Sequence, residues 1–264
     1  MAVAPKIAVV VLTHNRRHLL EQCITHVLGR TSEHTGEILV WDNGSDDDTA
    51  EFLATVTDPR FRVVRHEENI GLNAYDPAIR LTRAPMIVAL DEDVVDAPPR
   101  WDEALLDAFG KLPSVGFLVA NLAENPDDRT TSIMYGSNAP LYRVVERNGV
   151  RLKVGGPVGG WCAMTSRELY DAVGGIGRRR FTYWYWDGAY ISKLAKSGYE
   201  AAFLNDLQVR HSGGPVYSSD SPQKLEFWRA QERRVRRRRA VKRVLSRIPP
   251  VRRLNERHHW FVFP

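Results

Sequence analysis

The sequence is poor in cysteine and lacks any long apolar run. Its 264 residues include two cysteines, Cys23 and Cys162, which are far apart and lie in apolar settings. This argues against a disulfide framework and a CxxC metal motif, and is typical of buried, reduced thiols. The apolar run near the N-terminus is too short to cross a bilayer and has no signal-peptide flanks. We therefore expect a cytoplasmic protein.

Two common nucleotide-binding motifs are missing as well. No GxGxxG motif follows the first expected strand, which disfavours a Rossmann dehydrogenase. The glycine-rich loop Gly155–Gly160 lacks the lysine and hydroxyl residue of a P-loop, so that motif is disfavoured too. What is present is 43% hydrophobic and 26% charged residues, a composition typical of a soluble globular protein with one large core.

Positive and negative charge are unevenly distributed along the chain. Residues 223–264 hold 14 of the 37 lysines and arginines but 3 of the 32 acidic residues, a net charge of +11, so the remainder carries −6. A basic tail on an acidic body indicates two regions with different roles. We therefore expect a domain over residues 1–222 and a basic helical extension over residues 223–264.

Short apolar runs alternate with helical patterns in the first part of the chain. They predict strands at Lys6–Leu12, Glu37–Trp41, Phe61–Arg65 and Met86–Leu90, and helices at His18–Leu28, after Asp46 and at Pro77–Thr82. This alternation is typical of right-handed βαβ units in a parallel sheet, which places the chain in the α/β class.

The second half of the chain is less regular. It predicts helices at Trp101–Phe109, Ser166–Val173 and Asp187–Ser197, strands at Val115–Asn121, Phe203–Leu204 and Gln208–Val209, and a polar loop at Asn125–Thr131. Asn148 and Gly149, between two apolar segments, favour a β-hairpin with a type I′ turn.

Three of the first four expected strands end in polar clusters, at residues 13–15, 42–45 and 91–93. Ligands of open parallel sheets bind beyond the carboxyl ends of the strands, so the clusters should line one crevice. Asp91 and Asp93 would point to the same side of an extended chain, which suits Mn²⁺ or Mg²⁺ because hard cations prefer oxygen ligands. Taken alone, the acidic triplet would favour a solvated turn, and its position beside the other two clusters is what favours a metal site.

Several segments, in this order and spacing, resemble family 2 glycosyltransferases of the GT-A fold. They are residues 9–16, 41–45, 69–73, 91–93, 160–164, 181–187 and 209–211, so the resemblance covers about residues 6–215. It implies a Rossmann-like, mostly parallel sheet flanked by helices. It also implies a nucleotide-sugar donor, usually with a uracil or thymine base (UDP or dTDP), and a divalent metal.

The resemblance also assigns residues to the donor and to the metal. Those expected at the nucleotide are Thr13, Asn15, Arg16, Asp42, Asn43, Asn69, Gly71, Asp91 and Glu92, with Arg80 or Arg83 near the diphosphate. Those expected at the Mn²⁺ or Mg²⁺ ion are Asp91, Asp93 and His211. A lone histidine in this position could also be structural.

On the acceptor side, the resemblance makes Asp187 the general base of an inverting transfer. A carboxylate there would take the proton of the acceptor hydroxyl, although Asp187 could instead only cap the following helix. The acceptor site is expected to include Gly160, Trp161, Trp184 and Trp186. Trp186 stands where the family commonly has Glu, which leaves the role of that Glu unfilled. The acceptor could be linked to a lipid or a polysaccharide.

The basic extension over residues 223–264 is compatible with several kinds of partner. An arginine-rich helix with an apolar stripe suits an anionic membrane surface, here the inner face of the membrane. The arginines could instead bind nucleic acid, as in a nucleic-acid-binding protein or a transferase acting on modified bases. The helix could also pack on the body or in a homodimer. A nucleotidyltransferase would share the acidic metal site and is a further alternative.

The membrane hypothesis predicts that the full chain floats with vesicles containing anionic lipid and is released by high salt, since the attraction is electrostatic. Flotation assays measure this, with neutral vesicles as the control. Retardation of DNA across a salt series without flotation would support nucleic-acid binding, and binding to neither would support a structural role.

Overall fold

The computed structural model describes residues 6–126, 128–177 and 186–212, together with the single positions 229, 233 and 236. The chain separates into two compact units, residues 1–214 and 215–264. In the second unit, Arg229, Arg233 and Arg236 are helical and exposed, at a spacing that places them on one side of a helix. The rest of the expected basic extension lies outside the described residues, and its role stays a prediction.

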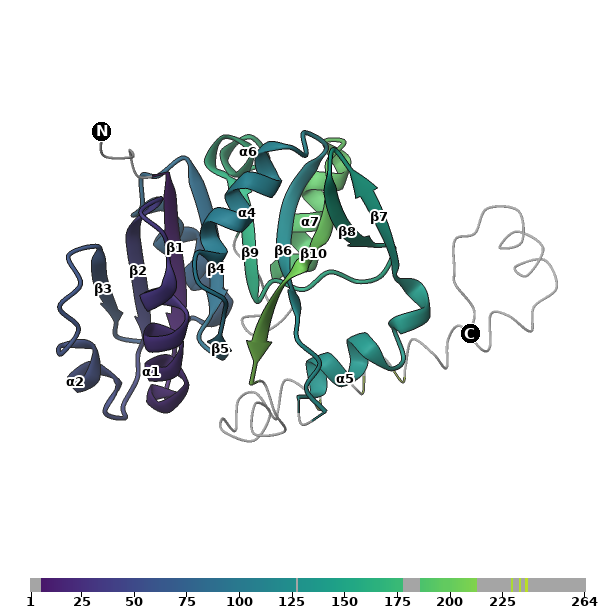
Figure 1. Cartoon of the computed structure of the whole chain (residues 1–264). Helices are drawn as coiled ribbons and strands as arrows, with labels where there is room; N and C mark the ends of the chain where they lie inside the picture. The colour runs from purple at the N-terminus through teal and green to yellow at the C-terminus, as the bar shows by residue number, and fades with distance from the viewer. Residues whose placement is uncertain are drawn as a thin grey trace. The chain divides into compact units, whose positions relative to one another are not determined.

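The first unit is built on a twisted mixed sheet (Figure 1). Its strands are β1 (Ile7–Thr13), β2 (Thr35–Asn43), β3 (Phe61–His66), β4 (Met86–Asp91), β5 (Val94–Asp96), β6 (Val115–Leu122), β7 (Arg143–Arg147), β8 (Val150–Val154), β9 (Cys162–Ser166) and β10 (Glu200–His211). In the described part of the chain their order is β3-β2-β1-β4-β9-β6-β10-β8-β7, with β5 paired to the end of β10.

Helices pack on both faces of this sheet. They are α1 (Arg17–His26), α2 (Thr49–Leu53), α3 (Tyr75–Arg80), α4 (Trp101–Gly110), α5 (Arg129–Tyr135), α6 (Arg167–Ala172) and α7 (Trp186–Lys196), with short 3₁₀ turns η1 (Leu28–Arg30), η2 (Gly71–Ala74) and η3 (Ala139–Leu141). Figure 1 shows α1 and α4 on one face of the sheet and α7 on the other. Trp101 ties α4 to the end of α1, because its Nε1 donates to the carbonyl of Val27 at 2.9 Å.

The parallel half follows from the apolar runs of the sequence. β1 pairs in parallel with both β2 and β4, and β2 pairs in parallel with β3. All seven residues of β1 are buried, as expected for a β-branched strand covered on both faces. The expected α/β class and the mostly parallel sheet flanked by helices are therefore confirmed.

The second half departs from expectation in three places. The two short strands expected near residues 203–209 are one strand, β10, whose pairing with β6 is irregular between Leu204 and Gln208. The loop expected over residues 125–131 becomes the start of α5, because Asp128 caps that helix. Strand β5 was not expected. The hairpin is confirmed, with positive φ at Asn148 and Gly149 joining β7 to β8.

This topology brings four strand ends together. Parallel pairing aligns the carboxyl ends of β1, β2 and β4, and β5 turns back from β4 to pair with the last residues of β10. The polar clusters of the sequence therefore share one edge with His211. Among the described residues, no helix combines the length and hydrophobicity needed to span a bilayer.

Candidate active site

The loops after β1 and β2 are tied to each other. Thr13 lies opposite Asp42 in the parallel register. The backbone N–H of Asn15 donates to Ser45 Oγ at 3.0 Å, and Asn15 Oδ1 accepts the N–H of Asp46 at 2.8 Å. Asn15 has φ of 53°, a left-handed conformation that asparagine tolerates better than most residues. The two polar clusters thus form one rigid rim.

Two buried oxygen atoms lie beneath this rim. The Asp42 side chain is 1% exposed; its Oδ1 accepts the N–H of Ser45, whereas its Oδ2 lies 3.7 Å from Arg65 Nε, beyond hydrogen-bond range. Thr13 Oγ1 is also buried and has no hydrogen-bond partner among the described residues. Because buried polar atoms are nearly always paired, these two mark a position where a polar ligand would be received.

Asn43, Asn69 and Gly71 form a support next to this position. Asn43 Nδ2 donates to Asn69 Oδ1 at 3.0 Å and to the carbonyl of Gly71 at 3.1 Å. Asn69 Oδ1 also accepts the N–H of Gly71, which has positive φ. The structure therefore brings these three residues together, with their polar atoms holding the β2 end against η2.

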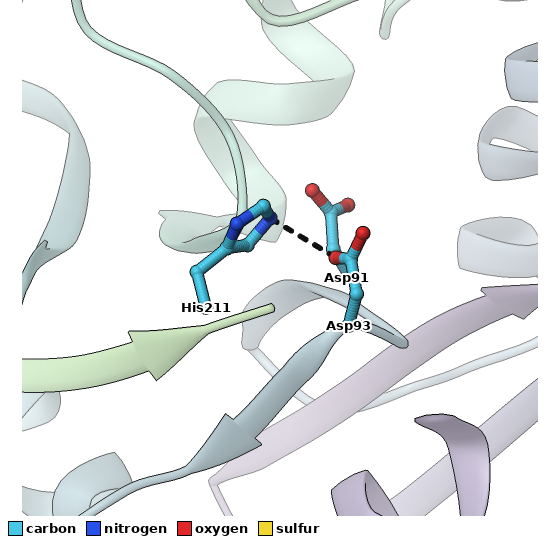
Figure 2. A group of neighbouring side chains, drawn as sticks. All are labelled: Asp91, Asp93 and His211. Carbon is cyan, nitrogen blue, oxygen red and sulfur yellow. Dashed lines mark ion pairs between the residues drawn. The ribbon is translucent and has the colours of Figure 1, made fainter. Parts of the chain in front are cut away.

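Acidic and basic side chains converge where β4, β5 and β10 meet (Figure 2). One ligand atom each from Asp91, Asp93 and His211 lie within 4.8 Å of one another. Asp93 is 1% exposed, and its Oδ1 lies 3.1 Å from His211 Nε2. This triangle of two carboxylates and an imidazole has the donor types and the spacing of a divalent-metal site.

The electrostatics of the triangle differ between its two acids. Burial, together with the nearby Asp93 carboxylate, raises the pKa of Asp91 to about 8. Burial alone would also raise the pKa of Asp93, but the charges of His211 and Arg16 hold it well below its usual range. Likewise, Asp93 and Asp128 outweigh burial and raise the pKa of His211. Ionisation of Asp91 is thus disfavoured by burial and by Asp93, a condition that a bound cation would relieve.

The structure places Arg16, expected at the nucleotide, beside the acidic triplet. Its side chain is 4% exposed, and its Nη1 lies 3.1 Å from Asp93 Oδ2 and 3.5 Å from Glu92 Oε1. The guanidinium therefore holds two of the three carboxylates of the acidic triplet, and it contacts the oxygen of Asp93 that does not face His211. Glu92, expected at the nucleotide, is this second partner of Arg16.

Tyr75 links the acidic triangle to the helix that begins with Trp186 and Asp187. Its hydroxyl donates to Asp91 Oδ1 at 3.1 Å, and its ring lies 4.5 Å from the Trp186 ring, centroid to centroid. A Cβ atom on Gly160 would lie 2.5 Å from the Trp186 ring and 3.2 Å from Asp187 Cβ. Gly160, Trp186 and Asp187 therefore lie against one another, and Tyr75 connects them to Asp91.

The family model of Glycosyl transferase family 2 matches residues 8–174, more than half of the chain. This chain belongs to glycosyl transferase family 2. The matched residues include the rim, Asp91 and Asp93. The resemblance seen in the sequence is therefore confirmed.

Solved structures show the same fold at low sequence identity. A mannosyltransferase from Pyrobaculum calidifontis, in complex with GDP-Man and Mn²⁺, has a TM-score of 0.54 and 22% identity, over 79% of this chain and 57% of that one. Glucosyl-3-phosphoglycerate synthase from Mycobacterium tuberculosis, with Mn²⁺ and UDP, has a TM-score of 0.54 and 18% identity, over 81% and 74%. GalNAc-T7, with UDP, GalNAc and Mn²⁺, gives 0.58 and 16%, over 78% and 44%. The expected GT-A fold is confirmed.

One curated relative is similar over most of the chain. The protein y4gI of Sinorhizobium fredii is 26% identical over 244 residues, which are 86% of this chain. The family 2 chain spans 27% of the length of that relative.

The aromatic residues expected at the acceptor are placed mostly in the core of this family 2 domain. Trp161 is 7% exposed, stacks on Phe203 and donates from Nε1 to the carbonyl of Ala120 at 2.8 Å. Trp186 is 6% exposed, between Tyr75 and Phe117. Stacking on a sugar needs an open ring face, so both indoles contribute packing beneath the site. Trp184 lies outside the described residues.

The placement of Arg80 or Arg83 at the diphosphate is wrong. Both precede β4, whereas Asp91 ends that strand, so they lie at its opposite end. The backbone N–H of Arg83 donates to Glu37, at the beginning of β2. The order of residues already places both arginines before the expected strand at Met86–Leu90, at the end away from Asp91.

Two residues of the site were missed from the sequence. Nothing in the residues around Tyr75 signals that its hydroxyl reaches Asp91. Asp128 contacts His211, and the two are 83 residues apart in the chain. The Asp128-Arg-Thr-Thr pattern could have predicted the helix cap, but not this contact.

Gly160→Ala should lower the free energy of unfolding by about 1–3 kcal/mol, because the new methyl group would overlap the Trp186 ring, which Tyr75 and Phe117 hold in place. Chemical denaturation measures this. Gly110→Ala, at the end of α4 with open space around the added carbon, is the control and should be neutral or stabilising. Equal stability of the two variants would contradict the close packing of Gly160 on Trp186.

Proposed function

We propose that this chain is a metal-dependent glycosyltransferase that moves a sugar from a nucleotide-diphosphate sugar to an acceptor hydroxyl. The observation that carries the proposal is the triangle of Asp91, Asp93 and His211, set beside a rim that contains unsatisfied buried oxygen atoms. Membership of glycosyl transferase family 2 supports the reaction class.

Mn²⁺ or Mg²⁺ fits the triangle. Asp91 and Asp93 offer hard carboxylate oxygens and His211 a ring nitrogen, and a cation would offset the burial and repulsion that disfavour ionisation of Asp91. When bound, the metal would neutralise charge on the departing diphosphate as a Lewis acid. The similar proteins from Pyrobaculum calidifontis and Mycobacterium tuberculosis were solved with Mn²⁺, which supports manganese here.

Asp42 and Thr13 would receive the base of a UDP- or dTDP-linked donor. The buried Asp42 Oδ2 is a hydrogen-bond acceptor, and uracil and thymine each present one ring N–H that needs one. Thr13 Oγ1 can donate to a base carbonyl from the neighbouring strand. Asn15, Asn43, Asn69 and Gly71 hold the loops that form this part of the site.

Asp187 would act as the general base of an inverting transfer. The acceptor oxygen attacks the anomeric carbon, the bond from that carbon to the diphosphate breaks, and the hydroxyl proton passes to the Asp187 carboxylate. The position of Asp187 supports this role: it is half-buried at the start of α7 and lies against Gly160 and next to Trp186, which Tyr75 links to Asp91.

The acceptor we propose is a hydroxyl of a lipid- or polysaccharide-linked substrate. The +11 charge of residues 223–264 supports delivery of the enzyme to an anionic membrane surface. The same helical extension would be the surface available for a homodimer.

A screen of nucleotide sugars with the full chain and Mn²⁺ tests the proposal, with release of free nucleoside diphosphate as the readout. We expect metal-dependent release from a UDP- or dTDP-sugar. Asp187→Asn should lower turnover by at least a hundredfold and leave donor affinity near wild type, since proton transfer by a positioned side chain contributes about 10²–10⁴-fold.

The variant also separates the two roles of Asp187. Asparagine caps helices as well as aspartate, so a capping role alone predicts normal turnover in Asp187→Asn. Asp107→Asn, on the exposed side of α4, is the matched control. Wild-type turnover in Asp187→Asn would remove it from the mechanism, and release of pyrophosphate in place of nucleoside diphosphate would indicate a nucleotidyltransferase.

A further inference from the structure

The imidazole of His211 lies between two buried carboxylates. Its Nε2 lies 3.1 Å from Asp93 Oδ1, in the triangle, and its Nδ1 lies 3.1 Å from Asp128 Oδ2, outside it. The Asp128 side chain is completely buried, and His211 is 7% exposed. A ring held at both nitrogens has one orientation, with Nε2 toward Asp91 and Asp93.

Asp128 is itself held firmly by the start of α5. Its Oδ1 accepts the N–H of Thr130 at 3.0 Å, and its Oδ2 accepts the N–H of Thr131 at 3.3 Å. The segment leading to it runs along the end of β10, where Asn125 Nδ2 donates to the carbonyl of His211 at 3.4 Å. The backbone N–H of Ser212 in turn donates to the carbonyl of Asp93 at 2.8 Å. The α5 cap, the β10 end and the metal carboxylates form one connected unit.

Helix capping alone does not account for this arrangement. A cap needs one oxygen on a short side chain, and serine or asparagine supplies it as well as aspartate does. Burying a full carboxylate is costly unless a positive partner is present, and His211 is the cationic side chain that pairs with Asp128 in the described part of the chain. The negative charge of Asp128 is therefore explained by its pairing with His211 and not by its role as a helix cap.

We propose that Asp128 is a positioning residue for the metal centre: it accepts the Nδ1–H of His211 and thereby directs Nε2 to the metal held with Asp91 and Asp93. Metal-bound histidines are generally oriented by such an outer carboxylate, which also makes the coordinating nitrogen a stronger ligand. This inference rests on the proposed function, because it requires a metal at the triangle. It adds α5, a helix outside the rim and the acidic triplet, to the metal centre.

Asp128→Asn and Asp128→Ser test the proposal. Both retain a helix cap, asparagine keeps the size without the charge, and serine is too short to reach His211. Mn²⁺ is titrated into each full-length chain and the free ion is followed by electron paramagnetic resonance. Pulsed measurements on the bound ion detect ¹⁴N coupling from a coordinating imidazole. Circular dichroism checks that each variant is folded.

We expect wild type to bind Mn²⁺ with ¹⁴N coupling, and Asp128→Asn to bind about 10- to 100-fold more weakly with reduced coupling. Asp128→Ser should lose at least as much. Ser166→Ala is the matched control. Ser166 caps α6, because its Oγ accepts the N–H of Leu169, and it lies at the end of β4 and β9 away from Asp91. This variant should leave Mn²⁺ affinity unchanged.

The outcomes separate this inference from the function on which it rests. Wild-type affinity and full ¹⁴N coupling in both Asp128 variants would overturn the role of Asp128 and leave the proposed function intact. Mn²⁺ binding to wild type without ¹⁴N coupling would overturn it too, by removing His211 from the metal. Failure of wild type to bind Mn²⁺ would contradict the proposed function itself.

Discussion

The structure depends on placing three consecutive acids, Asp91, Glu92 and Asp93, at the end of a strand with a buried interior. These acids follow the apolar residues of β4, and at Asp91 both desolvation and the neighbouring Asp93 carboxylate oppose ionisation. Two basic side chains contact Asp93: Arg16, which follows β1, and His211, which ends β10. The two basic residues come from the ends of different strands, so these contacts require the ends of β1, β4 and β10 to lie together.

This charge arrangement also organises the surrounding elements. Arg16 immediately precedes α1, so its ion pair with Asp93 fixes the turn that also carries Thr13 and Asn15. His211 ends β10, and its contact with Asp128, the cap of α5, holds the start of that helix beside the end of β10. Tyr75 joins Asp91 to the ring of Trp186 and hence to the start of α7. The rim, the triangle of Asp91, Asp93 and His211, and the proposed base are therefore parts of one packed network.

The sequence was informative where local pattern determines structure. The runs that became β1, β2 and β4 are apolar on both faces, and each ends abruptly in polar residues, so periodicity alone located the strands and the edge they share. It failed at β10, because Asn205 and Asp206 interrupt the apolar pattern at an irregular pairing and made one strand look like two. It also failed at β5, whose three residues are too few to show a period.

The site was predictable to the same extent. Asp91 and Asp93 were identified from residue type and position, and His211 from the resemblance to family 2, and the structure places the three together. The sequence could not show that Trp161 and Trp186 are buried, because tryptophan in a sequence does not reveal whether its face is open, and Trp161 is covered by Phe203. Tyr75 and Asp128 act through contacts between distant segments, which no local pattern encodes. The contacts of Tyr75 with Asp91 and of Asp128 with His211 therefore become visible only in the folded structure.

The central claim is that a divalent cation binds between Asp91, Asp93 and His211 beside a nucleotide diphosphate. The most direct test is a crystal of the protein soaked with Mn²⁺ and UDP or dTDP, measured at a wavelength where manganese scatters anomalously. The account predicts one strong anomalous peak within bonding distance of these three side chains, with the diphosphate against it. An ordered triangle without a peak, in a crystal where the nucleotide is bound, would contradict it.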